Sequence, residues 1–335
     1  MKIQLQSLRV INCGPLRDVC IHFNTNGDSP VTVLAGANGS GKTTALELIV
    51  GLAEMLLPNS ELPPVRPMLL RSEYTQADWL VDGERFSLFH GNKPDDAALA
   101  GSSFGRVGVA GNFQEQKHGH LPAMLRAQVR KQEAELNDLN DFDGRPGGNK
   151  GSDQALPSVL YFPYTRSLLP ITGDQMFKET TPYQWVYFYQ IVMQFKGSLD
   201  SYLIWLEYVD AKNYAAAIQF LNELDLDGKT FSISRRDLKA VVTTPDGGTH
   251  FLAGMSSGEQ NILILLLELR RHLLPHSLVL IDEIENSLHP AFQRRLVNCL
   301  TRLQETIPFQ LIATSHSLTI LEAFGTQTAR ILTQF

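Results

Sequence analysis

Four short aliphatic runs along the chain are typical of strands that are buried on both faces of a sheet. They are Val31–Ala35, Ser158–Phe162, Ser277–Ile281 and Phe309–Ala313. Continuous apolar strands of this length occur in parallel sheets that helices cover on both sides. Helix-like segments follow the first run and flank the last two, at Thr44–Leu57, Asn261–Leu274 and Ala291–Glu305. The pattern therefore predicts an α/β fold around a largely parallel core sheet.

Other segments alternate apolar and polar residues, as strands with one solvent-facing side do. They are Lys2–Ile11, Asp18–Phe23, Glu73–Val81 and Glu84–Phe89. The last two flank Asp82-Gly83, a dipeptide that favours a two-residue hairpin turn. We therefore expect an antiparallel layer beside the parallel core.

The middle of the chain has a different pattern. Gly, Asn, Asp and Ser are frequent from Gly91 to Asn112, Glu115–Asp141 has the spacing of a charged helix, and Gly144–Gln154 is loop-like. These features predict an exposed insertion over residues 91–157, with a mobile stretch at 143–155.

Residues 165–254 are expected to form a helical lobe. From Thr181 to Leu224 the chain is rich in aromatic residues at helical spacing, and the strand-like runs Phe231–Ile233 and Lys239–Thr244 follow. We interpret the aromatic residues as the core of this lobe. A protein-binding surface is the alternative, because aromatic side chains also anchor interfaces.

Composition narrows the class of protein. With 335 residues, 43% of them hydrophobic, the chain can bury a large core, and we expect one domain over residues 1–335. A net charge of −6 argues against a surface devoted to nucleic acid, although the pairs Arg235-Arg236, Arg270-Arg271 and Arg294-Arg295 are candidate phosphate contacts. Since no apolar stretch reaches the roughly 20 residues of a membrane span and no signal peptide is present, we expect a cytoplasmic protein without a membrane partner. The three cysteines lack metal-type spacing, which favours reduced thiols.

The stretch from Gly36 to Thr43 has the pattern of a phosphate-binding loop. It reads Gly-Ala-Asn-Gly-Ser-Gly-Lys-Thr and lies between a buried strand and a helix, where this chemistry requires it. Glycines let successive backbone N–H groups surround an anion, Lys42 reaches the outer phosphates, and the Thr43 hydroxyl can ligate magnesium. The sequence therefore predicts ATP and Mg²⁺ as cofactors. The predicted nucleotide contacts are Gly36, Asn38, Gly39, Ser40, Gly41, Lys42, Thr43 and Thr44.

Two acidic residues, Asp282 and Glu283, directly follow the third aliphatic run. Ligands of open α/β sheets bind at the carboxyl ends of strands, so these carboxylates are expected beside the nucleotide. Asp282 is the predicted magnesium ligand together with Thr43, and Glu283 is the predicted base that polarises the attacking water. A solvated acidic turn would not account for an aliphatic run that leads straight into two acids.

The segment Met255-Ser256-Ser257-Gly258-Glu259-Gln260 resembles the signature motif of ATP-binding cassette (ABC) ATPases. A Ser-Ser-Gly turn at the start of a helix presents hydroxyl and N–H groups to an anion. The resemblance implies that the signature of one copy contacts the nucleotide of a second copy, so that ATP holds a homodimer together. The contacts implied are Ser256, Ser257, Gly258 and Glu259.

Two further segments extend this resemblance. Thr314-Ser315-His316-Ser317 follows a short strand and is similar to the segment that carries the switch histidine of the family, which implies that His316 contacts the terminal phosphate. Glu285–Pro290 stands in the place of the D-loop, which implies that Asn286 and Ser287 touch the second copy.

The amino-acid sequences of the motifs are similar to those of the soluble "overcoming lysogenisation defect" (OLD) and RecF-like ATPases. The similar segments are Arg9–Leu16, the Ser-Ser-Gly-Glu-Gln at 256–260, and Asp282–Pro290. Membership would imply an ABC-type P-loop NTPase with a mixed parallel core sheet, an added antiparallel β layer and a helical lobe. The nucleotide-binding lobe would comprise residues 1–90 and 255–335.

Three functions follow from the resemblance. The first is a sensor and regulator in antiphage defence, which controls an effector such as a nuclease or toxin. We expect this effector to be separately encoded, because few residues follow His316. The second is a RecF-like ATPase of DNA repair, with nucleic acid as a partner. The third is a transporter ATPase subunit, which should carry a Q-loop glutamine where this chain has Arg166. For Arg166 a phosphate contact, a contact to a partner acid and an ordinary turn arginine all stay open.

Overall fold

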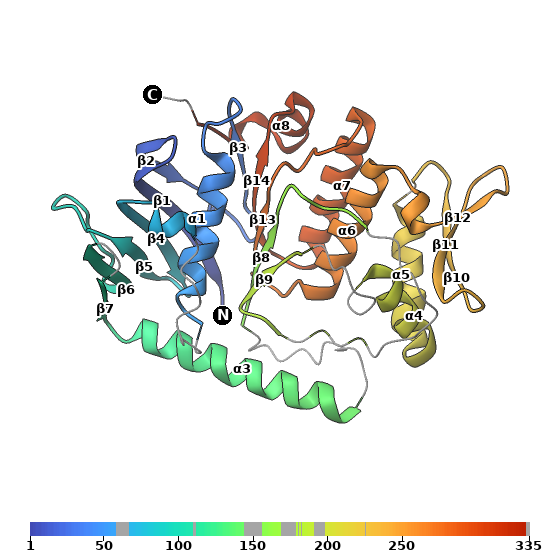
Figure 1. Ribbon diagram of the computed structural model, residues 1–335, viewed down its shortest axis with the longest axis horizontal. Helices are drawn as coiled ribbons and strands as arrows, with labels where there is room; N and C mark the ends of the chain where they lie inside the picture. The colour runs from blue at the N-terminus through green and yellow to red at the C-terminus, as the bar shows by residue number, and fades with distance from the viewer. Residues whose placement is uncertain are drawn as a thin grey trace.

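The computed structural model describes residues 1–57, 67–109, 112–143, 156–168, 179, 181, 183–190, 198–224 and 226–332. Apart from Asp143, which ends a helix, the stretch expected to be mobile at 143–155 lies outside these residues. The described elements form two six-stranded sheets, one three-stranded sheet, and helices that pack between and beside them (Figure 1).

A six-stranded parallel sheet forms the centre of the molecule (Figure 1). Its strands in spatial order are β15 (Ala329–Ile331), β3 (Val31–Ala35), β14 (Gln310–Ser315), β13 (Leu278–Ile281), β8 (Val159–Phe162) and β9 (Val186–Phe188). The four aliphatic runs form its four central strands, and each pairs in parallel with its neighbours. The predicted α/β fold with a parallel core is therefore confirmed.

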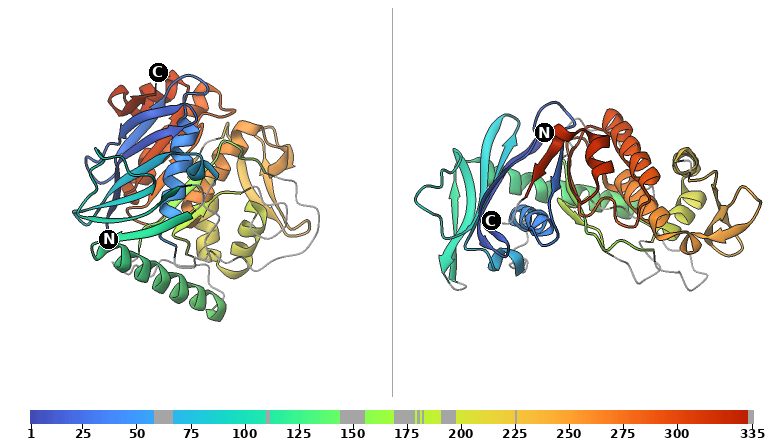
Figure 2. Two further views of the ribbon diagram at one scale, coloured as in Figure 1. Left: turned by 60° about the vertical axis from the view of Figure 1, so that its left-hand side comes forward. Right: turned by 90° about the horizontal axis from the view of Figure 1, so that it is seen from above.

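Helices cover both faces of this sheet because its strands carry apolar side chains on both sides. Leu278 and Leu280 of β13 belong to the core that contains α1 (Lys42–Glu54). Val279 and Ile281 belong to the core that contains α6 (Ser257–His272) and α7 (Pro290–Thr306). Successive strand residues point to opposite faces, so a continuous apolar run supplies both cores. Figure 2 shows α1 on one side of the sheet and α6 and α7 on the other.

A second six-stranded sheet lies beyond α1 (Figure 2). Its order is β2 (Leu16–His22), β1 (Ile3–Cys13), β4 (Tyr74–Val81), β5 (Glu84–Gly91), β6 (Ser102–Val109) and β7 (Asn112–His118). Neighbours run antiparallel except for β5 and β6. Asp82 and Gly83 have φ angles of 48° and 88°, as a type I′ hairpin turn requires. The antiparallel layer and its hairpin are therefore confirmed.

Strands β6 and β7 correct the expectation that residues 91–157 form an exposed insertion. Phe104 of β6 is fully buried, so part of this segment belongs to the core. Gly105 explains the error, because a Cβ at this position would lie 2.5 Å from the carbonyl oxygen of Phe89. A glycine that suggested a loop instead permits close approach of two strands. The helix that follows, α3 (Leu121–Asp143), begins six residues later than predicted because Glu115–His118 belong to β7.

A smaller lobe packs beside α6 and α7 (Figure 1). It contains α4 (Leu199–Val209), α5 (Ala211–Glu223) and a three-stranded antiparallel sheet of β10 (Thr230–Ser234), β11 (Lys239–Thr243) and β12 (Thr249–Phe251). Strands β10 and β11 match the two strand-like runs of the sequence. The helical spacing expected from residue 181 onward is wrong at β9, where Phe188 instead packs on Tyr161 of the neighbouring strand with ring centroids 5.0 Å apart. The bounds 1–90 and 255–335 thus omit β8 and β9 from the central sheet.

Two shorter α-helices, α2 (Pro67–Leu70) and α8 (Leu318–Phe324), complete the described α-helices. Within the described ranges, no helix combines the length and apolar character needed to cross a bilayer.

The antiparallel sheet contains a buried histidine without a hydrogen-bond partner. His90 of β5 is 1% exposed, and both of its ring nitrogens lack a partner among the described residues. The ring packs on Phe113, with centroids 4.6 Å apart. Burial, with the charge of Arg106, lowers the pKa of His90 to about 4. The native protein therefore keeps this side chain neutral at pH values where the unfolded chain binds a proton.

Replacing His90 with phenylalanine should reduce the loss of stability on acidification. Between pH 6.5 and 4 the unfolded wild-type chain gains a proton that the native state refuses, so stability falls as the pH falls, by on the order of 2 kcal/mol from this group. Urea unfolding at pH 7 and pH 4.5 should show a smaller difference for His90→Phe than for the wild type. The exposed His22, replaced by glutamine, is the control. Equal pH dependence in wild type and His90→Phe would contradict the assignment.

Candidate functional site

Four neighbouring strands of the parallel sheet end at one edge, and each leads into a residue of the candidate site. The phosphate loop follows β3, His316 follows β14, Asp282 follows β13, and Arg166 lies four residues after the end of β8. Because the carboxyl ends of parallel strands meet at one edge, segments from four distant parts of the sequence converge there.

The phosphate loop turns tightly from β3 into α1. Gly41 caps the helix with a φ of 93°, a left-handed conformation that favours glycine. A Cβ at Gly41 would lie 2.7 Å from the side chain of Leu16, so the turn between β1 and β2 packs directly against the loop.

Lys42 is held at the loop by backbone oxygens. Its ammonium donates to the carbonyl oxygens of Gly36 at 3.0 Å and Ala37 at 2.8 Å. Burial lowers the pKa of Lys42, and the negative charges of Asp282 and Glu283 oppose that shift. The cation therefore lies in the field of the two acids that follow β13.

Asp282 connects the phosphate loop to the sheet. Its carboxylate is fully buried and accepts hydrogen bonds from the Thr43 hydroxyl at 2.9 and 3.1 Å and from the Thr314 hydroxyl at 2.6 Å. The two residues predicted to ligate magnesium are thus in direct contact. A hydroxyl and a carboxylate at this distance are hard oxygen donors of the kind that Mg²⁺ takes beside phosphates, so the residues present fit the ion.

Glu283 and the residues after it form a tight turn beside His316. Glu283 has a φ of 44°, and its N–H donates to the Thr314 hydroxyl at 2.7 Å. The His316 N–H donates to the Glu285 carboxylate, which ties the end of β14 to this turn. The His316 side chain is exposed and available to a ligand.

The signature segment forms the start of α6. Ser256 is the N-cap, and its hydroxyl and the Glu259 carboxylate form a capping box, with Ser256 Oγ donating to Glu259 at 2.8 Å. Lys229, 30 residues earlier, forms an ion pair with the other oxygen of Glu259. Ser256 and Ser257 are exposed, whereas Gly258 and Glu259 are buried. The exposed serines leave this end of the helix accessible to a second molecule.

The D-loop turn packs against the signature of the same chain. A Cβ at Gly258 would lie 2.6 Å from the carbonyl oxygen of Ser287, so the motif needs glycine at that position. The Asn261 amide donates to the carbonyl oxygen of Asn286 at 3.1 Å. Ser287 itself is exposed.

Sequence reasoning missed the roles of Thr314 and Lys229 in the site, and it left three alternatives open for Arg166. Thr314 bonds both Asp282 and Glu283, Lys229 pairs with the signature, and Arg166 binds the backbone after β13. The position of Thr314 near the end of an apolar strand beside β13 was the available signal for the first. Nothing in the spacing indicates Lys229, which reaches Glu259 only through the fold.

In the pair Arg270-Arg271, proposed as a phosphate contact, the structure contradicts the prediction at Arg271, whereas Arg270 is exposed. Arg271 is almost completely buried and pairs with Glu179 at 3.1 Å and Glu268 at 3.8 Å. Tyr187 of β9 donates to Glu268 at 2.7 Å. This cluster therefore joins α6 to the helical lobe and to the central sheet. The exposed face on which the prediction relied does not exist at Arg271.

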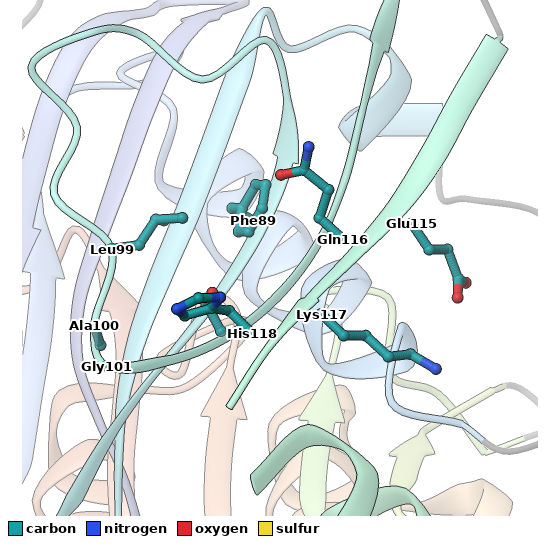
Figure 3. Close-up of a pocket in the computed structure, with 9 residues that line it drawn as sticks. Phe89, Leu99, Ala100, Gly101, Glu115, Gln116, Lys117 and His118 are labelled. Carbon is teal, nitrogen blue, oxygen red and sulfur yellow. The ribbon is translucent and has the colours of Figure 1, made fainter. Parts of the chain in front are cut away.

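A hollow of about 710 Å³ lies away from the strand ends, on the antiparallel sheet (Figure 3). Phe89, Leu99, Gln116 and His118 point toward it, whereas Glu115 and Lys117 point away (Figure 3). None of the residues predicted to bind nucleotide lines it.

The fold and this arrangement of strand ends define an ABC-type P-loop ATPase fold. Two protein-family models match parts of the chain. Residues 211–322 match one described as "AAA domain, putative AbiEii toxin, Type IV TA system", and residues 7–52 match one described as "AAA domain". The matched segments contain the phosphate loop, the signature and Asp282. No curated protein matches the chain significantly.

Solved structures of SMC heads are similar in fold. The SMC head bound to the C-winged helix domain of ScpA is 12% identical, with 95% of this chain and 91% of that chain covered and a TM-score of 0.50. The SMC head domain from Thermotoga maritima is 15% identical, with 96% and 92% covered and a TM-score of 0.44. An SMC head with an extended coiled coil, bound to the C-terminal domain of ScpA derived from Pyrococcus furiosus, is 10% identical, with 96% and 92% covered and a TM-score of 0.45. The first of these likenesses shows the fold alone.

Proposed function

We propose that this protein binds and hydrolyses ATP in the presence of Mg²⁺. The observation that carries the proposal is the direct contact of Thr43 and Asp282, at 2.9 Å, beside a glycine loop that opens a helix. Phosphate groups bind readily at such helix starts, because free N–H groups and the helix dipole face them. Two AAA-domain models match the segment that contains the phosphate loop and the segment that contains Asp282, and these matches support the same activity.

Each residue has a defined task in this proposal. The loop N–H groups and Lys42 hold the phosphates, and Thr43 and Asp282 hold magnesium, which would neutralise phosphate charge in the transition state. Glu283 accepts the proton of the attacking water, and His316 contacts the terminal phosphate. Thr314 keeps Asp282 and Glu283 in register by bonding both.

The nucleotide also joins two copies of the chain. Ser256 and Ser257 are exposed at the start of α6. N–H groups and the helix dipole at this start can bind an anion, in addition to the phosphate loop. A phosphate held by Lys42 of one copy and by Ser256 of another would hold both copies together, and hydrolysis would loosen them. Each site then consists of residues from two chains.

Ser256→Arg tests this shared site. The change places a long charged side chain on the exposed face while ATP binding to a single chain is retained. Light scattering with ATP and Mg²⁺ should show a dimer for the wild type and a monomer for Ser256→Arg. Ser256→Ala is the matched control, because it loses the same cap, at a cost of about 1 kcal/mol, without adding bulk. Undiminished ATP-dependent association of Ser256→Arg would disprove the shared site.

The cellular role we propose is that of a sensor and regulator in antiphage defence, acting on a separately encoded nuclease or toxin. It rests on the similarity of the motifs to OLD-type ATPases and on the match to a model described as a putative AbiEii toxin of a type IV toxin–antitoxin system. Co-expression with neighbouring genes during phage challenge tests it: protection should require a neighbour and an intact Lys42. A RecF-like role would instead give DNA-stimulated hydrolysis, and the burial of Arg271 removes one candidate phosphate contact.

A further inference from the structure

Arg166 occupies an unusual position for a charged side chain. It is 6% exposed and lies after β8, next to the turn that carries the two acids. Its guanidinium donates to four backbone carbonyl oxygens rather than to a carboxylate. The acceptors and distances are Pro163 at 2.7 Å, Phe162 at 3.5 Å, Asp282 at 2.7 Å and Glu283 at 2.9 Å.

These contacts fix both peptide units around Glu283. Its N–H donates to Thr314, and its carbonyl oxygen accepts from Arg166, so the residue is held from both sides. The φ of 44° at Glu283 is one that a residue with a side chain adopts only when its surroundings impose it. Because the backbone sets the direction of the Cα–Cβ bond, Arg166 helps to fix the direction in which the Glu283 side chain leaves the backbone.

The charge of Arg166 is difficult to explain as simple packing. Within the described residues the guanidinium forms no ion pair, and its Nε has no hydrogen-bond partner. Burying an unpaired cation is costly, and neutral donors could satisfy carbonyl oxygens at lower cost. Burial lowers the pKa of Arg166 to about 10, while the charges of Asp282 and Glu283 oppose that shift, so the side chain stays protonated at neutral pH. The cation thus lies close to Asp282 and Glu283 but bonds their backbone carbonyl oxygens instead of their carboxylates.

The segment that carries Arg166 is itself tied to other parts of the fold. The carbonyl oxygen of Tyr164 accepts from the Asn286 amide at 2.7 Å, and that of Ser167 accepts from the Tyr189 hydroxyl at 3.2 Å. Residues 163–167 therefore contact the D-loop turn on one side and the residue after β9 on the other. A displacement of this segment would move the backbone of Glu283.

We propose that Arg166 is a positioning residue for hydrolysis, which orients Glu283 and couples its orientation to residues 163–167. The inference rests on the proposed ATPase activity. Arg166 stands where a transporter ATPase would carry the Q-loop glutamine. In this proposal the arginine does not contact the nucleotide but acts on Glu283, by bonding the backbone of Glu283. Its loss should lower kcat and leave ATP affinity unchanged.

The test compares Arg166→Met and Arg166→Lys with the wild type in ATP binding and in steady-state hydrolysis. A small misplacement of a catalytic group costs about 100-fold in rate, so kcat of Arg166→Met should fall by about that factor while the Kd for ATP changes less than about threefold. Lysine retains the charge but not the planar fork that reaches carbonyls of two strands, and Arg166→Lys should show a loss of about 10-fold. Added guanidinium should restore part of kcat in Arg166→Ala and none in Glu283→Gln.

Arg126→Met is the matched control, because Arg126 also donates to a backbone carbonyl, that of Met55 at 2.6 Å, but lies away from the site. If Arg166→Met keeps the wild-type kcat, or loses ATP binding instead of turnover, the positioning role is wrong. If that variant does not fold, Arg166→Lys decides in the same way. A wild type without hydrolysis would overturn the proposed function itself, whereas an active wild type with an inactive Glu283→Gln and a fully active Arg166→Lys overturns only this inference.

Discussion

Glu283→Gln should abolish turnover while leaving the nucleotide bound. The amide keeps the size of the side chain but cannot accept the proton of the attacking water, and loss of a general base costs about 10²- to 10⁴-fold in rate. The structure favours this separation of binding from chemistry, because Thr43 and Asp282 contact each other, and Lys42 lies at the loop, without using the Glu283 carboxylate. Calorimetry should therefore give the wild-type affinity for ATP, and a phosphate-release assay should give almost no product.

The same variant should accumulate as an ATP-bound dimer. If hydrolysis removes the bridge between two copies, a chain that binds but does not hydrolyse retains it. Light scattering after incubation with ATP and Mg²⁺ reports the mass, and Glu305→Gln, an exposed change at the end of α7, is the control. A kcat within about threefold of the wild type would contradict the role of Glu283 as base.

Lys42→Ala should lose nucleotide affinity by two orders of magnitude or more. Charge-assisted hydrogen bonds to phosphate are worth about 1.5–3 kcal/mol each, and the lysine is also the cation that offsets phosphate charge at the loop. In the structure its ammonium donates to the Gly36 and Ala37 carbonyl oxygens. Gly36 and Ala37 are at least partly exposed. Because water can then bond their carbonyl oxygens, removal of the Lys42 side chain should cost little stability.

Calorimetric titration with ATP and thermal unfolding separate these two effects. Lys42→Ala should unfold near the wild-type temperature and show no measurable ATP binding at concentrations that saturate the wild type. Lys212→Ala removes an exposed lysine of α5 and controls for the change in net charge. Wild-type affinity in Lys42→Ala would show that the glycine loop does not bind the triphosphate.

Much of the central sheet was predictable because local pattern and tertiary environment agree there. A strand covered on both faces must be apolar throughout, and β3, β8, β13 and β14 carry that signal in their own sequences. Ligands of parallel sheets bind at the carboxyl ends of the strands, so the sequence also predicted that Lys42, Asp282 and His316 lie near one another. Their roles remain predictions until the variants are measured.

The rest depended on contacts between distant residues. Strand β6 contains glycines that local reasoning assigns to loops, and Gly105 is required there only because Phe89 lies against it. Strand β9 has aromatic residues whose spacing also fits a helix, and its pairing with β8 decides the outcome. Arg166 stood at a recognisable place, but two of its four partners are carbonyl oxygens 116 and 117 residues further along the chain, and no residue type in the sequence indicates such backbone contacts.

The course of α6 has a mechanical consequence. Its 16 residues span about 24 Å, at 1.5 Å per residue, from the exposed Ser256 to the buried ion pairs of Arg271. Breaking a buried ion pair is strongly unfavourable, so the far end of the helix cannot slide away from Glu179. The helix therefore connects the two regions: if a second copy's phosphate binds at Ser256 as proposed, a tilt of α6 would also move Glu179 and Tyr187, which contact the other end of the helix.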